Sequence, residues 1–149
     1  KLARELGVDE TDRVLNRESG LKGLSGGHND IRDIQSAADA GDADAQLALD
    51  VYVHSARHWI GAYFAQLNGL DALVFTAGIG ENRTGTRAAI CANLEQLGIR
   101  LDPEKNEATE AEEAVISAED SPVKVIVIPT NEELVVAREV KRFLDHNRN

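Results

Sequence analysis

One stretch, residues 71–82, constrains the fold of this chain more than any other. It reads DALVFTAGIGEN, a short apolar run that ends at once in two glycines and a polar pair. Continuous apolar residues at 72–76 predict a strand buried on both faces of a parallel sheet. Gly78 and Gly80 predict a tight turn with bare backbone N–H groups at the carboxyl edge of the sheet, where α/β proteins bind ligands. An ordinary strand-to-helix turn is the alternative, because a short glycine motif alone is weak evidence.

Length and composition bound the class of protein. A chain of 149 residues can enclose one hydrophobic core, which predicts a single domain over residues 1–149. Because it starts at Lys1 and contains no methionine, we expect it to be part of a longer protein. One cysteine excludes an internal disulfide, and no apolar run approaches the ~18 residues of a membrane helix, so we expect a cytoplasmic protein with no membrane partner. The net charge of −10 argues against nucleic acid as a partner.

Capping signals mark the helices of the first half. Glycine-rich residues 19–27 are expected to form a loop. Asn29 or Asp30 can cap a short helix over 31–40, and Asp42 can cap a long helix over 43–67. The long helix has apolar side chains on more than one face, so we expect another domain or a second copy of the chain to cover it.

The second half predicts strands that alternate with helices. A crossover helix over 87–97 and a second buried strand over 123–128 follow the glycine turn. Between them, residues 102–120 carry eight acidic side chains and one lysine, which predicts a solvated connection. Thr130 is the expected N-cap of the last helix, with Glu133 reaching back in a capping box. The fold class is therefore α/β, with parallel strands and flanking helices.

Five runs of sequence together resemble the carboxyl-terminal part of the acetate kinase family: SGLKGLSG, NDIRDI, FTAGIGENRTGTR, LGIRLDPEKN and VIPTNEEL. The resemblance covers nearly the whole chain. It implies a ribonuclease-H-like domain of the superfamily of actin, sugar kinases and heat-shock proteins, in which two domains close on a nucleotide. It also implies a homodimer and Mg-dependent phosphoryl transfer between ATP and acetate, giving acetyl phosphate and ADP. The catalytic residues that grip acetate are expected upstream, and none falls on this chain.

The same resemblance assigns site residues by position. The family's nucleotide loop falls on Gly78, Ile79, Gly80, Glu81 and Asn82, and its segment beside the ribose and adenine falls on Asp30, Ile31 and Arg32. The glutamate that holds Mg falls on Glu132. Just before Asp30 the family usually has small hydroxyl residues, whereas this chain has His28 and Asn29.

Other functions stay open at this point. Propionate and butyrate kinases differ from acetate kinases in a carboxylate pocket that this chain lacks. A nucleotide-binding domain without turnover and a module that only dimerises are the alternatives outside enzyme chemistry. His54 and His58 have a spacing that can hold zinc, but no third ligand is evident, so packing or surface roles are favoured. Cys91, among apolar neighbours, is expected to be a buried small residue.

Overall fold

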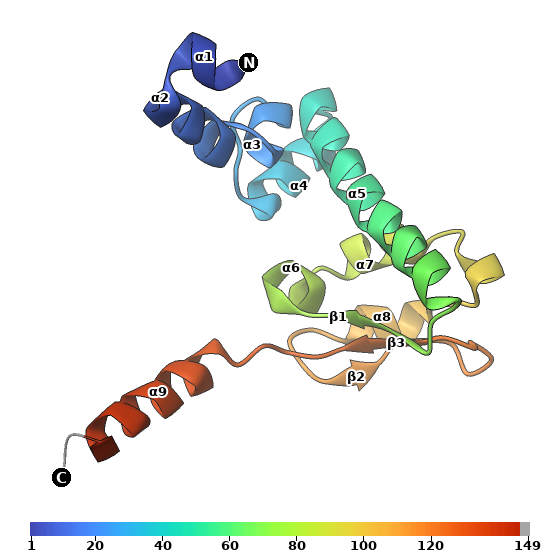
Figure 1. The fold of residues 1–149 in the computed structure, drawn as a ribbon. Coiled ribbons are helices and arrows are strands. Elements are labelled where there is room, and N and C mark those ends of the chain that lie inside the picture. Colours follow the sequence, from blue (N-terminus) through green and yellow to red (C-terminus); the bar gives the residue numbers. More distant parts are fainter. Residues whose placement is uncertain (147–149) are drawn as a thin grey trace. The chain divides into compact units, whose positions relative to one another are not determined.

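The computed structural model describes residues 1–146, apart from the side chain of Glu132, in two compact units. The first unit, Lys1–Gly69, is helical (Figure 1). It contains α1 (Leu2–Leu6), α2 (Val8–Arg13), the π-helix η1 (Val14–Glu18), α3 (Leu21–Leu24), α4 (Ile31–Asp39) and α5 (Ala43–Leu67).

The predicted caps of α4 and α5 are confirmed. Asp30 accepts a hydrogen bond from the Arg32 backbone N–H, and Asp42 accepts bonds from Asp44 N–H and Ala45 N–H. Asn68 ends α5 in a left-handed conformation, with φ 59°. The small core beneath these helices is formed by Ile34, Ala45, Ala48 and Leu49, with Leu21, Leu24 and Ile31 packed against it.

The expected loop over residues 19–27 is wrong in part, because α3 forms within it. Gly20, with φ 63°, makes the turn into that helix, and Gly26 and Gly27 make the turn after it with φ 71° and 129°. Glycine is needed at these three positions because L side chains rarely adopt positive φ. The glycines thus mark the two turns rather than one continuous loop.

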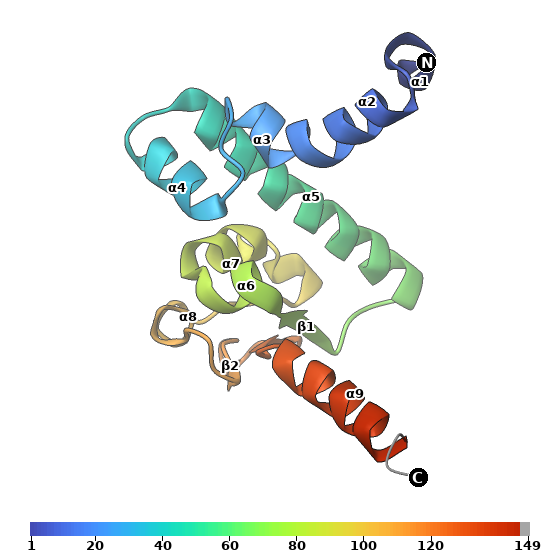
Figure 2. The same ribbon diagram turned by 90° about the vertical axis from the view of Figure 1, so that its left-hand side faces the viewer.

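The second unit begins at Leu70 and holds the sheet. It contains β1 (Ala72–Phe75), α6 (Ala77–Asn82), α7 (Thr84–Cys91), the 3₁₀-helix η2 (Glu95–Leu97), α8 (Pro103–Ala108), β2 (Ala114–Val115), β3 (Lys124–Val127) and α9 (Glu132–His146). In two views α6 and α7 lie over the same face of the sheet (Figures 1 and 2). Among the described residues, no helix is both long and apolar enough to cross a membrane.

The sheet has the strand order β1-β3-β2. β1 and β3 are parallel, as predicted, with Leu73 opposite Val125 and Phe75 opposite Val127. Their carboxyl ends therefore lie side by side at one edge. β2 adds an antiparallel edge strand that the sequence analysis did not predict. The expectation that β1 is buried on both faces is wrong for this chain, because Phe75 is buried but Val74 is 44% exposed.

Two further expectations for this unit are corrected. The crossover helix starts earlier and ends sooner than 87–97: α7 stops at Cys91, Asn93 takes a left-handed φ of 57°, and η2 follows. The acidic stretch is structured, since α8 and β2 lie within it. Its charged side chains face outward while Asn106, Thr109 and Ile116 are buried, so the net charge concealed an inward face.

Candidate functional site

A short helix, α6, occupies the place where a glycine turn was predicted at the carboxyl end of β1. The sharp change of direction is made by Ala77, whose φ is 60°, and not by either glycine of the motif. Gly78 and Gly80 both lie inside the helix. The absence of their side chains therefore needs a reason other than backbone conformation.

Packing explains Gly80 but not Gly78. A Cβ added to Gly80 would lie 3.2 Å from the Phe75 carbonyl carbon and 3.4 Å from the Phe75 Cβ. Gly80 is thus required by the close approach of α6 to the end of β1. A Cβ added to Gly78 would meet nothing within 4 Å, and Gly78 is exposed. The fold leaves the backbone at Gly78 open to a ligand.

Arg87, which is fully buried, holds this helix from beneath. Its Nη1 donates to the carbonyl oxygens of Gly80 and Glu81, each at 2.9 Å. Nε donates to Asn106 Oδ1 at 2.8 Å, and Nη2 donates to the Asn106 and Thr109 carbonyl oxygens at 2.9 and 2.7 Å. Burial lowers the pKa of Arg87, an effect opposed by nearby acidic groups. One side chain therefore fixes the end of α6 against the end of α8.

The sequence analysis assigned Arg87 no role beyond starting a helix. A signal was present, because Arg87 lies three and four positions before Ile90 and Cys91, which are both buried. An arginine on the inward stripe of a helix has to satisfy several donors, and backbone carbonyls are the available acceptors.

Glu81 is buried, at 8% exposure, and its carboxylate points back into the protein. Its Oε1 accepts hydrogen bonds from the Thr130 backbone N–H at 2.7 Å and from Thr130 Oγ1 at 2.9 Å. The Thr130 N–H lowers the pKa of Glu81; burial opposes this, and the Thr130 hydroxyl and Ala77 N–H add to the lowering. The end of α6 is thereby tied to the segment that follows β3.

The predicted capping box at the start of α9 is wrong. The Thr130 N–H that Glu133 was expected to reach is bound by Glu81. The side chain of Asn131 acts as the cap instead, since its Oδ1 accepts the Leu134 N–H at 2.9 Å. Glu132 begins α9 directly after this cap, and its side chain lies outside the described residues.

The family resemblance implies a magnesium ion at Glu132, and the residue types present can be compared with what that ion requires. Within the described residues, no group of three or more His, Cys, Asp or Glu side chains could hold a metal ion. Mg²⁺ in kinases is bound by one or two carboxylates together with water and phosphate oxygens, so a single carboxylate is chemically compatible with this ion when a nucleotide is bound.

The segment assigned to ribose and adenine lies in the first unit. Arg32 is paired with its own helix cap: Nη2 lies 2.6 Å from Asp30 Oδ2, and Nε donates to both carboxylate oxygens. This pairing raises the pKa of Arg32, whose side chain is 71% exposed. An exposed, braced guanidinium offers a flat face on which an aromatic base can stack. Ile31 packs against the core of this unit.

Comparison with known proteins identifies the family of the chain. The sequence model described as "Acetokinase family" matches residues 2–138. An acetate kinase of Leifsonia xyli is 57% identical over 134 residues, covering 90% of this chain and 34% of the relative. An acetate kinase of Clostridium botulinum is 53% identical over 144 residues, covering 95% of this chain and 36% of the relative. The chain thus spans about a third of the length of these relatives.

Solved structures give the same result. A Porphyromonas gingivalis acetate kinase matches 96% of this chain and 36% of its own, with a TM-score of 0.84 and 38% identity. The match to the Entamoeba histolytica acetate kinase covers 95% of this chain and 38% of that protein, with a TM-score of 0.85 and 34% identity. The match to a Francisella tularensis propionate kinase covers 93% of this chain and 35% of that protein, with a TM-score of 0.79 and 40% identity. With its α/β fold and an Acetokinase match over most of its length, the chain belongs to the acetokinase family.

Proposed function

We propose that this chain supplies the nucleotide-binding part of a kinase that transfers a phosphoryl group between ATP and acetate, giving acetyl phosphate and ADP with the help of Mg²⁺. The observation that carries the proposal is the open backbone at Gly78, on a helix that Arg87 and Glu81 hold in place. Phosphoryl transfer depends mainly on positioning and on neutralising charge, which suits a rigid, uncrowded backbone beside the phosphates.

We assign the nucleotide contacts to two segments of the chain, and each assignment is a separate proposal. In the second unit, Gly78, Ile79, Gly80 and Asn82 would line the phosphates, and Asn82 is already braced by a 2.9 Å hydrogen bond from its Nδ2 to the Gly78 carbonyl oxygen. Glu81 belongs to the same loop, and we assign it a positioning role because its carboxylate is engaged by Thr130. In the first unit, Asp30, Ile31 and Arg32 would contact the ribose and adenine.

Glu132 would hold the magnesium ion. A carboxylate close to nucleotide phosphates is unfavourable unless a cation lies between them. When bound, Mg²⁺ would neutralise charge on the phosphate oxygens. The hydrogen bond between Glu81 and Thr130 supports this assignment, because it fixes the chain two residues before Glu132 to α6, the helix that carries Gly78.

Propionate is a second candidate acceptor. The propionate kinase of Francisella tularensis is 40% identical, against 38% and 34% for the two acetate kinase structures. Identity to these three solved structures therefore does not separate acetate from propionate, although the sequence relatives at 57% and 53% identity are acetate kinases. A cytoplasmic location belongs to the same proposal, since the chain has one cysteine, Cys91, which is buried and cannot form a disulfide within the chain.

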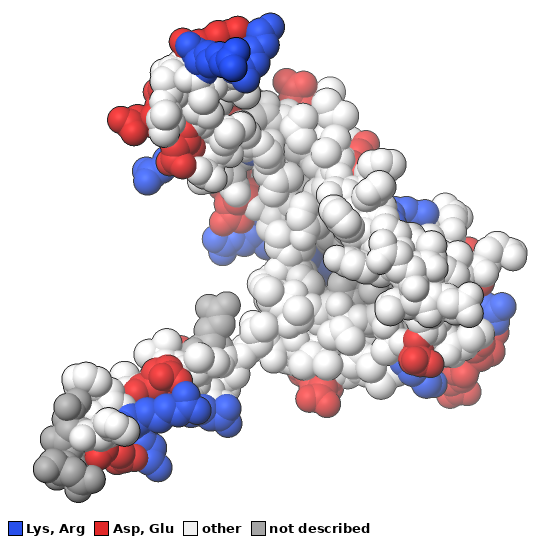
Figure 3. All heavy atoms as spheres, in the orientation of Figure 1, with Lys and Arg blue, Asp and Glu red and all other residues white. Residues whose placement is uncertain are grey.

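A homodimer formed through α5 completes the proposal. Trp59 is 56% exposed, Tyr63 55% and Leu67 67%, and the Trp59 and Tyr63 rings lie 6.0 Å apart. The surface along α5 shows few charged side chains (Figure 3). An exposed apolar face of this kind is typical of a protein–protein contact.

Titration of the 149-residue chain with ADP and Mg²⁺ tests the nucleotide site. Gly78→Ala and Gly85→Ala are matched variants, because both glycines lie in helices without positive φ and neither Cβ would meet an atom within 4 Å. We expect weak ADP binding that Gly78→Ala reduces and Gly85→Ala leaves unchanged, with both variants folded. Equal affinity in all three proteins would contradict the assignment of α6 to the nucleotide.

Turnover is a separate readout. The isolated chain is expected to form no acetyl phosphate above a blank, because a chain spanning a third of its relatives' length supplies only part of a site built from two domains. Measurable acetyl phosphate formation by the purified chain would overturn that expectation. The assignment of α6 to the nucleotide would still be decided by the ADP titration.

A further inference from the structure

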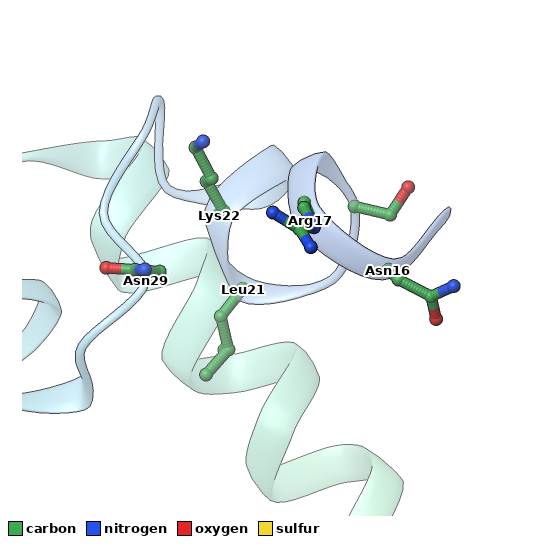
Figure 4. A pocket seen from close by; sticks show the side chains of 6 residues that line it. Asn16, Arg17, Leu21, Lys22 and Asn29 are labelled. Carbon is green, nitrogen blue, oxygen red and sulfur yellow. The ribbon is translucent and has the colours of Figure 1, made fainter. Parts of the chain in front are cut away.

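A pocket lies within the first unit, where η1, α3 and the loop before α4 meet. It has a volume of about 540 Å³ and is lined by Asn16, Arg17, Ser19, Leu21, Lys22 and Asn29. Figure 4 shows Arg17 on η1 and Lys22 on α3, with Asn29 on the neighbouring loop. No function discussed so far uses this pocket.

The charges of the pocket are unbalanced. Two of the six lining side chains are cationic and none is acidic, in a chain with a net charge of −10. Within the part of the chain that the structure describes, Arg17 and Lys22 form no ion pair, whereas Arg13 close by is bound to Glu10 and Glu18. Two like charges that share one pocket repel each other, so an anion between them would be favourable.

The hydrogen-bonding groups point to the same ligand class. The Asn29 side chain makes no hydrogen bond among the described residues and is exposed. Asn16 uses one N–H on Asp12, at 2.8 Å, and keeps the other. Ser19 donates to the Val14 carbonyl oxygen at 2.9 Å, which leaves its oxygen as an acceptor only. The free donors are therefore a guanidinium, an ammonium and amide N–H groups, a set that suits phosphate oxygens.

Local backbone structure places these residues around one pocket. η1 is a five-residue π-helix, a rare form that occurs frequently at functional sites. Gly20, with φ 63°, turns the chain from η1 into α3, so that Arg17 and Lys22, five positions apart in the sequence, line one pocket. Leu21 adds an apolar wall.

We propose that this pocket binds a small organic phosphate. The two cations match a phosphate monoester, which carries about −1.5 to −2 charges at neutral pH. The volume lies in the range of small-molecule sites, roughly 300–1,000 Å³, and with the wall of Leu21 it leaves room for a carbon skeleton beside the phosphate. Asp30 and Arg32, which pair with each other, are not among the residues that line the pocket.

Calorimetric titration of the full chain at fixed ionic strength tests the proposal, with glycerol 3-phosphate as the probe and inorganic phosphate and succinate as comparisons. We expect saturable binding of glycerol 3-phosphate, weakened about tenfold or more by Arg17→Gln or by Lys22→Gln. Arg4→Gln, which removes the same charge from an exposed side chain of α1, should leave affinity unchanged. Circular dichroism verifies that each variant is folded.

Several outcomes would overturn the proposal. The first is a lack of saturable binding of glycerol 3-phosphate. The second is a loss of affinity on Arg4→Gln equal to that on Arg17→Gln or Lys22→Gln, which would indicate general charge attraction. Equal affinity for succinate would exclude specificity for phosphate, and equal affinity for inorganic phosphate would exclude a role for the carbon skeleton. Displacement of the probe by ADP, or weaker ADP binding on Arg17→Gln, would assign the pocket to the nucleotide instead.

Discussion

Glu81 and Thr130, 49 residues apart, are joined by two hydrogen bonds to a single carboxylate oxygen, from the Thr130 N–H at 2.7 Å and its hydroxyl at 2.9 Å. The first residue lies in the last turn of the helix that carries Gly78, and the second lies two residues before Glu132. This contact links the two chain segments to which we assign the phosphates and the magnesium ion.

Removing this contact should affect stability and magnesium use together. Thr130→Val loses the hydroxyl donor but keeps the backbone donor, and should lower the melting temperature by roughly 2–6 °C. In the full-length kinase it should raise the Mg²⁺ concentration needed for half-maximal activity. Thr86→Val, on the neighbouring helix α7, is a control that leaves the Glu81 contact intact. An unchanged Mg²⁺ dependence would show that the contact serves the fold alone.

The same contact predicts an acid-sensitive contribution to stability. The pKa of Glu81 is lower in the folded protein than its ordinary value of 4.5, so the folded state favours the ionised form. Its contribution is complete above the unfolded pKa and is lost as the pH falls through the lower, folded value. Glu81→Gln should therefore be less stable than the parent in urea at pH 7, and the difference should shrink below about pH 4.5. A difference that stays constant down to pH 3 would contradict this.

Arg87 should be essential for the second unit to fold. Arg87→Lys retains the charge but cannot reproduce five hydrogen bonds from three nitrogens, so it should cost about 3 kcal/mol or more in unfolding free energy. Arg83→Lys is a matched control, because Arg83 forms no ion pair in the described part of the chain and should change stability by less than about 0.5 kcal/mol. Similar urea midpoints for the two variants would refute the role of Arg87.

The two glycines of α6 should respond differently to alanine. Gly80→Ala places a methyl group 3.2 Å from the Phe75 carbonyl carbon and should destabilise by about 1–3 kcal/mol. Gly78→Ala meets nothing and should be neutral, or stabilising by up to about 1 kcal/mol, because alanine favours the helix. Thermal unfolding of both variants without nucleotide measures the difference. The opposite order of stability would mean that α6 approaches β1 differently.

The cap of α9 gives a prediction that replaces the expected capping box. Asn131→Ala should cost about 1 kcal/mol and fray the first turn of α9, because the Leu134 N–H loses its acceptor. Glu133→Ala should have little effect. Amide hydrogen exchange at the start of α9 compares the two variants. Faster exchange in Glu133→Ala but not in Asn131→Ala would mean that the capping box forms after all.

The sequence predicted best what is decided by neighbouring residues. Asp42 and Asn68 mark the ends of α5 through local hydrogen bonding and a left-handed residue, so both ends of this helix were predictable. The parallel pairing of β1 and β3 was predictable because a helix was expected between two short apolar strands, and such a crossover joins parallel strands. The resemblance to a family led to the assignment of residues 78–82 to the nucleotide, which the glycine spacing alone left undecided.

Contacts across long stretches of chain were not predictable. Nothing near Thr130 in sequence indicates that Glu81 takes the N–H group expected for Glu133. The acceptors of Arg87 lie on α6 and α8, up to 22 residues away. Net charge misled for residues 102–120, because it averages the outward side chains of α8 with the inward ones.

The order of Ala77 and Gly78 has a consequence for how this chain has been selected. Ala77 holds a φ of 60°, which costs an L residue about 1 kcal/mol and would cost glycine almost nothing, while Gly78 sits in a helix that alanine would favour. A chain optimised only to fold would carry the two residues in the reverse order. Directed evolution for thermal stability should find that exchange readily, and the resulting proteins should become heat-tolerant and lose affinity for nucleotide in the same step.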